Sequence, residues 1–508
     1  MRPRFSPEFG VKYILPVVSG LAGVALVLFI TSKYGIGLAP DSANYVSAAR
    51  SLLAGRGLLC FDRTPFTSWP PLYPLLLAVF GLGGMDVIAG ARILHALAFG
   101  AIVFLSVRLL RTALKSSALV IIAALFVLFS NTLQSLSAML LSEAVFSLLT
   151  LLFLAAAAKL LAVRTLRSLV VCSVLAALLP LQRYIGLALV LSGVVAILVW
   201  LRGWDLRRRF ASAGVVLGSA VLPVAGWIAR NYLLTSTLTG QRVPARRALF
   251  LNAAAVLQVV RHWFLPSLGT GWMSWVLLGL FTAALGFLMA YAWRSTRGES
   301  STGAILTRFS LVSTVVYLAV LISAASLVAF DEVSARLFSP LYVPVVLVVF
   351  VGLERTGMLV ASKLGRKRPV KAVLVLLCAV AVLHPFNWTL RFSRRFRVYG
   401  MGGYTHQEWQ ESPLLRWLRQ NRLAGQTLSN DPAAVYLLAG KTARMSLRLT
   451  DDVAAMCSTR ELKPGDHLVW FYRVERHYLY ELSDLREMLP MEVLHSAEDG
   501  AVLVFRAD

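Results

Sequence analysis

Apolar runs about as long as a membrane-crossing helix recur along the first 390 residues of this chain. A helix needs roughly 17 to 25 residues to cross the hydrocarbon core of a bilayer. Of the 508 residues, 58% are hydrophobic and 15% are charged, and the mean hydropathy is +0.71, whereas a soluble domain carries about 25% charged residues. The sequence therefore predicts an all-α polytopic membrane protein with about eleven transmembrane helices. Their expected centres are residues 17–30, 91–107, 119–129, 144–161, 169–181, 185–200, 211–228, 272–292, 311–330, 341–353 and 372–388.

The two ends of the chain differ from this pattern. The first apolar run, 13–32, follows three basic residues but exceeds the roughly 7 to 15 residues of a signal-peptide core, so we expect an uncleaved first transmembrane helix. From residue 391 onward charged residues become frequent and apolar runs short, which predicts a transmembrane domain at 1–390 and a small soluble α/β domain at 391–508. The elements expected in the latter are a strand at 426–429, a helix at 430–439, and strands at 444–449, 467–472 and 501–505.

The net charge of +25 arises from 50 Lys and Arg against 25 Asp and Glu. Much of the excess lies in short loops between apolar runs, which is typical of the positive-inside rule rather than of a nucleic-acid-binding patch. The basic loops are 108–115, 159–167, 202–209, 294–308 and 355–371. If each predicted helix crosses the membrane in turn, these loops and the N-terminus lie on the inner side. The segment 33–90 and the C-terminal domain then lie on the outer side. The run 72–82 is too short to span and predicts an interfacial or re-entrant helix.

Two acidic residues stand near the outer ends of predicted membrane helices, where ionisable groups are costly and are functional candidates. Asp41 precedes a stretch whose helical periodicity predicts a short amphipathic helix on the membrane surface. Glu143 opens the run at 144–161. Each has a structural alternative, Asp41 as the N-cap of its helix and Glu143 as a complement to the helix dipole.

The cysteines and histidines show no metal-ligand spacing. The four cysteines are Cys60, Cys172, Cys378 and Cys457, without a CxxC pair, and the seven histidines are scattered singly. No metal or other cofactor is therefore expected. Cys60 and Cys457 would both lie outside, which leaves open both a disulfide between them and two separate thiols.

Several short motifs occur in a fixed order along the outer segments. They are Pro40-Asp41 to Tyr45, Gly55-Arg56-Gly57, Trp69-Pro70-Pro71-Leu72-Tyr73-Pro74, Leu141-Ser142-Glu143-Ala144, Gln182-Arg183-Tyr184-Ile185-Gly186, Arg230-Asn231 and Ser334-Ala335-Arg336-Leu337-Phe338-Ser339-Pro340-Leu341-Tyr342. In this order they resemble bacterial GT-C glycosyltransferases, the superfamily of protein O-mannosyltransferases and lipid A aminoarabinose transferases. The resemblance covers residues 1–353 and the tail stretch 429–436. Ser42 follows Asp41 where protein O-mannosyltransferases have an Asp-Glu pair, so a protein acceptor is not inferred; the tryptophan-rich signature of oligosaccharyltransferases is absent.

This resemblance implies transfer of a sugar from a polyprenyl-phosphate carrier to an acceptor hydroxyl, with inversion, at the outer face of the cytoplasmic membrane. Asp41 would be the general base, and Glu143 would position the acceptor or hold Asp41 through a donor between them. Arginine suits the leaving phosphate because it is always charged and forked. The candidates for phosphate binding are Arg336, Arg183, Arg230 and Arg242, and those for the substrate groove are Tyr45, Tyr73, Tyr184 and Tyr342. For Arg336, snorkelling or pairing with Asp331 or Glu332 is the alternative.

The expected partners are the lipid-linked sugar, membrane lipid, and a lipid, glycan or protein acceptor, without nucleic acid. Two other functions remain alternatives. A transporter or flippase would place polar groups near the membrane midplane and often shows inverted repeats, which this sequence lacks. A non-catalytic scaffold of the same fold would not need both Asp41 and Glu143.

Overall fold

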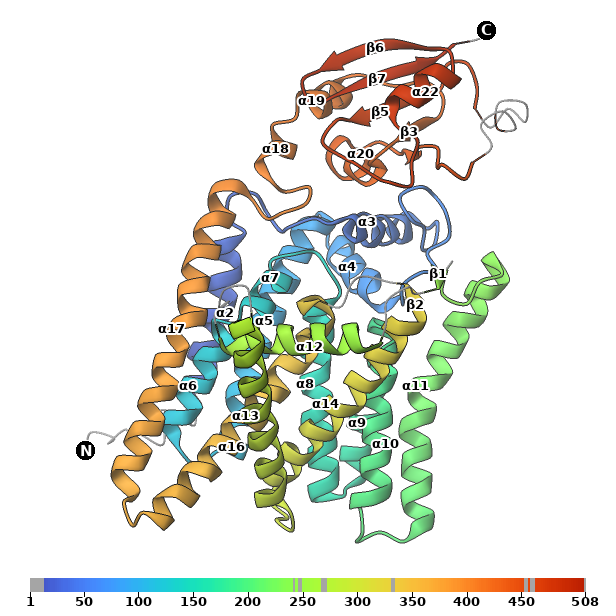
Figure 1. The fold of residues 1–508 in the computed structure, drawn as a ribbon. Helices are drawn as coiled ribbons and strands as arrows, with labels where there is room; N and C mark the ends of the chain where they lie inside the picture. Colours follow the sequence, from blue (N-terminus) through green and yellow to red (C-terminus); the bar gives the residue numbers. More distant parts are fainter. Residues whose placement is uncertain are drawn as a thin grey trace, which may run out of the picture. The chain divides into compact units, whose positions relative to one another are not determined.

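The computed structural model describes residues 13–240, 243–244, 249–265, 272–329, 334–451, 456 and 462–506. Their contacts form two compact units (Figure 1). The first unit comprises residues up to Ser32, Thr67–Leu76 and Ala91–Arg395; the second comprises Lys33–Phe66, Leu77–Gly90 and Phe396 onward. The sequence analysis grouped residues 33–90 with the membrane helices, whereas most of that segment makes its contacts with the C-terminal residues.

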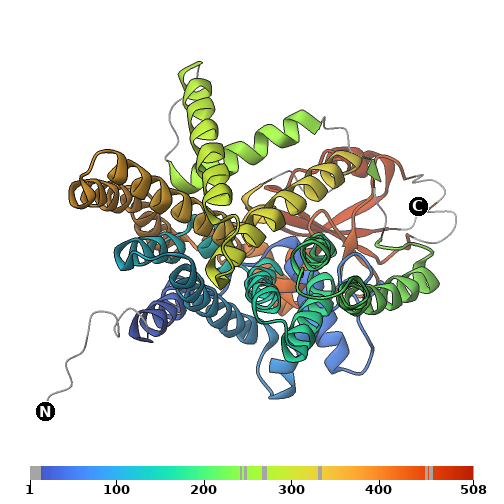
Figure 2. The same cartoon turned by 90° about the horizontal axis from the view of Figure 1, so that it is seen from below.

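The first unit is helical. Its helices are α2 (Leu15–Ile30), α5 (Val87–Ala113), α6 (Ser117–Leu128), α7 (Asn131–Ser137), α8 (Glu143–Val163), α9 (Leu166–Gln182), α10 (Gly186–Trp200), α11 (Leu206–Thr235), α12 (Leu249–Phe264), α13 (Trp272–Thr296), α14 (Thr302–Leu327), α15 (Ala335–Phe338), the 3-10 turn η2 (Ser339–Leu341), α16 (Tyr342–Lys363) and α17 (Lys367–Tyr399). Two short antiparallel strands, β1 (Val243–Pro244) and β2 (Val328–Ala329), pair with each other. Figure 2 shows the neighbouring helices α8, α9, α10 and α11, in teal to green.

Each apolar run expected to cross the membrane lies mainly on a helix. Among the described residues, seven helices are long and apolar enough to span a membrane, or eight if α6 and α7, which are bent by 44° at their junction, form one span. Three further predicted runs are the apolar helices α2, α9 and α10, with 16, 17 and 15 residues. The sequence analysis missed α12, which runs crosswise to the membrane helices (Figure 1) and buries Asn252, Val256, Val260 and Trp263 along one side.

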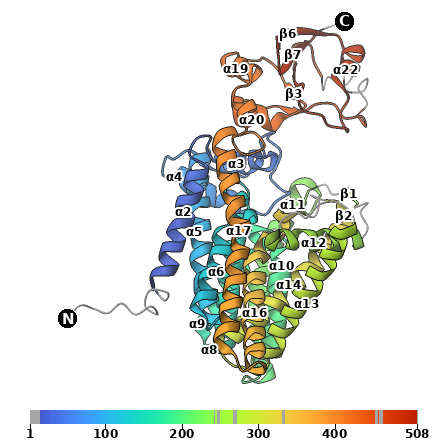
Figure 3. The same ribbon diagram turned by 60° about the vertical axis from the view of Figure 1, so that its left-hand side comes forward.

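Glycines bring α2 and α5 into close contact (Figure 3). A Cβ built on Gly20 would lie 3.1 Å from the carbonyl oxygen of Gly100, and one on Gly23 would lie 3.2 Å from the Cα of Gly100. Small residues at such positions let helix backbones approach in a membrane, where van der Waals packing drives association. The sequence of α2 therefore fixes which face of this helix meets α5.

The second unit contains a five-stranded mixed sheet of order β4-β3-β5-β7-β6. Its elements are α3 (Pro40–Leu53), α18 (Gln407–Gln410), α19 (Pro413–Gln420), β3 (Thr427–Ser429), α20 (Pro432–Ala439), β4 (Arg444–Met445), β5 (His467–Phe471), α22 (Leu482–Met488), β6 (Met491–Ala497) and β7 (Gly500–Phe505). The helix α4 (Leu72–Leu82), expected as an interfacial or re-entrant helix, begins in the first unit and ends in the second. Strand β3 is parallel to β4 and β5, whereas β7 is antiparallel to β5 and β6.

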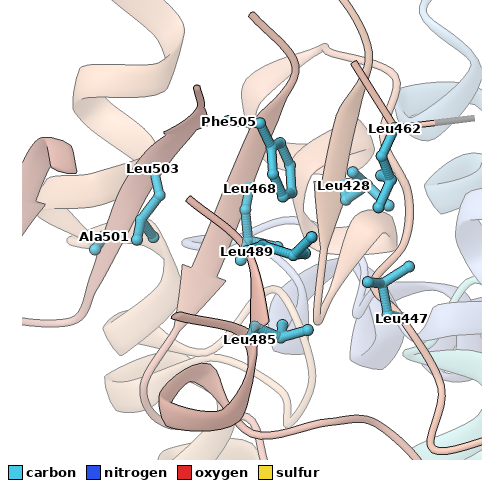
Figure 4. Close-up of a cluster of buried hydrophobic side chains, with 9 residues drawn as sticks. All are labelled: Leu428, Leu447, Leu462, Leu468, Leu485, Leu489, Ala501, Leu503 and Phe505. Carbon is cyan, nitrogen blue, oxygen red and sulfur yellow. The ribbon is translucent and has the colours of Figure 1, made fainter. Parts of the chain in front are cut away.

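The sheet and α22 enclose an apolar core (Figure 4). Its buried members include Leu428 on β3, Leu468 on β5, Leu485 on α22 and Leu503 on β7. The expected elements at β3, α20, β5 and β7 are present, and β4 is shorter than predicted. The edge strand β6 was not predicted, because its side chains are mostly exposed or half-buried and leave no apolar alternation in the sequence.

Candidate active site

Glu143 forms the centre of a cluster of charged residues at the start of α8. It is the first residue of that helix, and its side chain is only 1% exposed. Its Oε1 accepts a hydrogen bond from Nη1 of Arg183 at 2.6 Å and another from Nε of Arg336. One buried carboxylate therefore receives two guanidinium groups from elements far apart in the sequence.

The turn between α9 and α10 brings Arg183 to this point. Arg183 leaves α9 in an extended conformation, with φ −152° and ψ 132°. A Cβ on Gly186 would lie 2.5 Å from the backbone of Leu179, so only glycine lets the chain turn this closely. Nη1 of Arg183 also donates to Oγ of Ser142 at 2.8 Å, and Nε2 of Gln182 donates to the Ser142 carbonyl at 3.0 Å. These bonds fasten the turn to the residue before α8.

Arg336 lies on α15, whose position is set by neighbouring membrane helices. The hydroxyl of Tyr317, on α14, donates to the Leu337 carbonyl at 2.9 Å. Oγ of Ser147, on α8, lies 3.4 Å from Oγ of Ser339 in the turn that follows α15. The alternative partners proposed for Arg336, Asp331 and Glu332, lie outside the described residues.

Two guanidinium groups against one carboxylate give the cluster an excess of positive charge, part of which is exposed. The side chains of Arg183 and Arg336 are 20% and 22% exposed. Each guanidinium carries five N–H donors, and the contact with Glu143 uses one of them on each arginine. Ion pairing with Glu143 therefore restricts the orientation of both guanidinium groups.

The tyrosines proposed for the substrate groove occupy different environments. Tyr73 and Tyr342 are fully buried. The hydroxyl of Tyr73 lies 2.7 Å from Nε2 of His95, and that of Tyr342 donates to the Phe126 carbonyl at 3.0 Å. These two residues pack the interior of the first unit, so any effect they have on a substrate is exerted through their neighbours.

Tyr184 and Arg230 both contact Trp227. Nε1 of Trp227 donates to the Tyr184 hydroxyl at 3.2 Å, and the Arg230 guanidinium lies 4.4 Å from the centre of the Trp227 rings. Arg230 also donates to the side chain of Asn231 at 3.0 Å, and Asn231 in turn donates to the carbonyl of Thr67 at 3.1 Å. Arg242, the fourth arginine proposed, lies outside the described residues.

Asp41 belongs to the second unit and is the second residue of α3. The proposed role as N-cap is wrong: the N-cap position is Ala39, Pro40 is the first helical residue, and Oγ of Ser42 accepts a hydrogen bond from the Ala39 amide at 2.9 Å. Tyr45, one turn later, is 1% exposed and packs 6.2 Å from the Phe66 ring. The helix was expected on the membrane surface, but most of its residues are buried in protein contacts, among them contacts with α20.

His95 was missed by the sequence analysis, although its position in a predicted membrane helix was a usable signal. It is fully buried on α5 beside Tyr73.

Within the described ranges no group of three or more His, Cys, Asp or Glu side chains is arranged to hold a metal ion. Cys60 forms no disulfide with another described cysteine, and Cys457, the partner considered for it, lies outside those ranges.

Comparison of the whole structure with solved structures identifies the fold. No protein-family model and no curated protein sequence matches the chain. The structure is similar to ArnT from Cupriavidus metallidurans in the apo state, with a TM-score of 0.62 and 12% sequence identity over 96% of this chain and 97% of ArnT. It is equally similar to ArnT bound to undecaprenyl phosphate, with a TM-score of 0.62 and 14% identity over the same shares.

The solved structure of a second protein supports the same assignment. The arabinofuranosyltransferase AftD from Mycobacteria matches 97% of this chain and 40% of its own, with a TM-score of 0.53 and 15% identity. ArnT and AftD are both GT-C glycosyltransferases. The chain therefore has the GT-C fold, with an ArnT-like transmembrane part and a small C-terminal sheet domain.

Proposed function

We propose that this protein is an inverting glycosyltransferase that moves a sugar from a polyprenyl-phosphate carrier to an acceptor hydroxyl. The observation that carries the proposal is the convergence of Arg183 and Arg336 on Glu143 within a fold shared with ArnT over 96% of the chain. One of the similar ArnT structures is bound to undecaprenyl phosphate. Two arginines whose orientation is fixed, at the outer end of membrane helices, form a suitable binding site for the phosphate of such a lipid.

In the proposed reaction the acceptor oxygen attacks the anomeric carbon while the bond from that carbon to the phosphate oxygen breaks. Asp41 takes the proton of the acceptor hydroxyl, as a general base does. The polyprenyl phosphate leaves with the bonding electrons and gains negative charge. Arg183 and Arg336 stabilise this charge more in the transition state than in the bound donor, which is the condition for accelerating the step.

The contacts of Glu143 favour a positioning role for this residue. A carboxylate that already accepts from two guanidinium groups has a low affinity for a further proton, because both cations favour its charged form. We therefore assign proton abstraction to Asp41 and the orientation of the two arginines to Glu143. We further propose that the reaction takes place at the outer face of the cytoplasmic membrane, with a lipid, glycan or protein as acceptor.

The test compares Asp41→Asn with Asp62→Asn, an equivalent substitution on the same unit. Purified variants in detergent are incubated with native membranes that supply lipid-linked sugars and acceptors, and released polyprenyl phosphate is measured by mass spectrometry. We expect Asp41→Asn to lower the rate by about 10² to 10⁴, the usual contribution of a general base, and Asp62→Asn to match the wild type.

Two results would contradict the proposal. Normal turnover by Asp41→Asn would remove this residue from the chemistry. Recovery of the lipid-linked sugar intact after exposure to the wild-type protein, with the sugar moved across the membrane of a vesicle, would indicate a flippase instead.

A further inference from the structure

A short segment after α17 holds the residues that lead into α3. The amide of Tyr404 donates to the Leu38 carbonyl at 2.9 Å, and the Leu38 amide donates to Oγ1 of Thr405 at 3.1 Å. Gly403, with φ +80°, packs so closely that a Cβ built on it would lie 2.3 Å from the Leu38 carbonyl oxygen. We call residues 403–405 the clasp. The clasp is hydrogen-bonded to Leu38, three residues before Asp41, and belongs to the same unit as Asp41.

The clasp is anchored in the C-terminal sheet domain by a buried side-chain pair. The hydroxyl of Tyr404 donates to Oδ1 of Asp431 at 2.7 Å, and the two residues are 3% and 4% exposed. The same Oδ1 accepts from the Ala434 amide at 3.3 Å, which makes Asp431 the N-cap of α20. Nη2 of Arg476 lies 3.5 Å from Oδ2 of Asp431. Asp431 therefore connects the clasp to α20, and α20 packs against α3.

The charge of Asp41 acts on this anchored pair. Burial raises the pKa of Tyr404, and the charges of Asp431 and Asp41 raise it further. The phenol thus stays protonated and remains a donor to Asp431 at every pH at which the protein works. Neither the clasp nor Asp431 has a role in the proposed chemistry, yet the clasp is bonded to Leu38, two residues before the first residue of the helix that carries the base.

We propose that the clasp and Asp431 are positioning residues that hold the start of α3 and thereby fix the carboxylate of Asp41. The inference rests on the proposed function. It gives the C-terminal domain a part in catalysis that acts through Asp41. Displacement of a reacting group by about 1 Å costs on the order of 10² in rate, so a clasp that prevents such displacement has a measurable effect.

The principal test uses two adjacent glycines. In Gly403→Ala the new methyl group meets the Leu38 carbonyl at a strained φ, whereas a Cβ on Gly402 meets nothing within 4 Å. We expect Gly403→Ala to lower kcat by about 10- to 100-fold with the KM for the lipid-linked sugar unchanged, and Gly402→Ala to behave as wild type. Hydrogen exchange of the Leu38 amide should be faster in Gly403→Ala alone.

Two further variants separate positioning from loss of folding. Tyr404→Phe keeps the ring and removes the hydroxyl bonded to Asp431, so it should also lower kcat at unchanged KM. Leu485→Ala empties part of the core beneath the sheet, where Leu485 is 1% exposed, and should lower the melting temperature of the C-terminal domain while leaving kcat unchanged.

The outcomes are decisive in either direction. Equal kcat in Gly403→Ala, Tyr404→Phe and Gly402→Ala would overturn the positioning role, as would a loss in Leu485→Ala as large as that in Gly403→Ala. Faster exchange at Leu38 with normal kcat would show that the clasp holds the chain without serving the reaction. A wild-type protein without transferase activity would instead contradict the proposed function, and the exchange measurement would still test the clasp.

Discussion

At the scale of single residues, Glu143 holds the side chains of two arginines, Arg183 and Arg336. Replacement by Gln removes the charge that both guanidinium groups face and leaves two cations close together. Breaking a buried ion pair from one side costs about 3–5 kcal/mol, and the partial exposure of Arg183 and Arg336 places the expected loss at the lower end. Thermal unfolding in detergent should therefore show a lower melting temperature for Glu143→Gln.

Arg336 provides a second test of the same cluster, directed at the donor. One charge-assisted hydrogen bond to phosphate contributes about 1.5–3 kcal/mol, so Arg336→Ala should lower the rate at limiting donor by about tenfold to a hundredfold. Arg336→Lys keeps the charge but lacks the Nε that donates to Glu143, and it should restore only part of the rate. Unchanged turnover in both variants would assign Arg336 a purely structural function.

Cys60 gives a prediction that depends on pH. Burial, followed by the charge of Asp62, raises the pKa of the Cys60 thiol to about 12. The reactive thiolate is therefore scarce at neutral pH, and alkylation by iodoacetamide should be slow at pH 7–8 and accelerate as the pH approaches 12. The control is an exposed cysteine introduced as Ala54→Cys in a protein whose own cysteines are replaced by serine. Fast alkylation of Cys60 at pH 7 would contradict the buried environment.

These residues also show what sequence alone could and could not predict. The motifs singled out Glu143, Arg183 and Arg336, but the pairs lie 40 and 193 residues apart in the chain. Their convergence depends on how α8, α9 and α15 pack, which no single segment encodes. The structural alternative for Asp41, the N-cap, is wrong for a local reason: Pro40 lacks an amide hydrogen and suits the first helical position, so the helix starts one residue before Asp41.

At the scale of elements, the contact between α2 and α5 depends on the absence of side chains. A Cβ on Gly100 would lie 2.4 Å from Cγ2 of Val24 and 2.7 Å from the carbonyl oxygen of Gly20. Gly100→Ala must therefore separate two helix backbones, and overpacking of this kind costs about 1–3 kcal/mol. Gly286→Ala on α13 is the matched control, since a Cβ there meets nothing within 4 Å. The melting temperature in detergent should fall only for Gly100→Ala.

Helices and their packing partners were predictable to different degrees. Long apolar runs specify membrane helices because backbone groups in lipid must be satisfied within the segment, and every expected run lies mainly on a helix. The partner of α3 was not predictable. The sequence of α3 is amphipathic, a pattern that fits a helix on a membrane surface and a helix against a protein neighbour equally well. In the structure α20, nearly 400 residues later in the chain, packs against it.

At the scale of the whole molecule, the basic loops predict the direction of insertion. The loop that contains Arg207, Arg208 and Arg209 should face the cytoplasm, and the C-terminal domain should lie on the opposite side. Alkaline phosphatase, active only outside the cytoplasm, should therefore be inactive when fused after Arg209 and active when fused after Asp508. If the two fusions were both active or both inactive, the predicted topology would be contradicted.

The discontinuous second unit has a consequence for the biogenesis of the protein. Its first part, Lys33–Phe66, is synthesised long before its last part, which begins at Phe396. At about 5–20 residues per second, the intervening roughly 300 residues take about 15–60 s to translate. During this interval α3 has no α20 to cover its buried face. The nascent chain must shelter that face against lipid or a chaperone, and a ribosome stalled before Phe396 would leave the second unit unfinished.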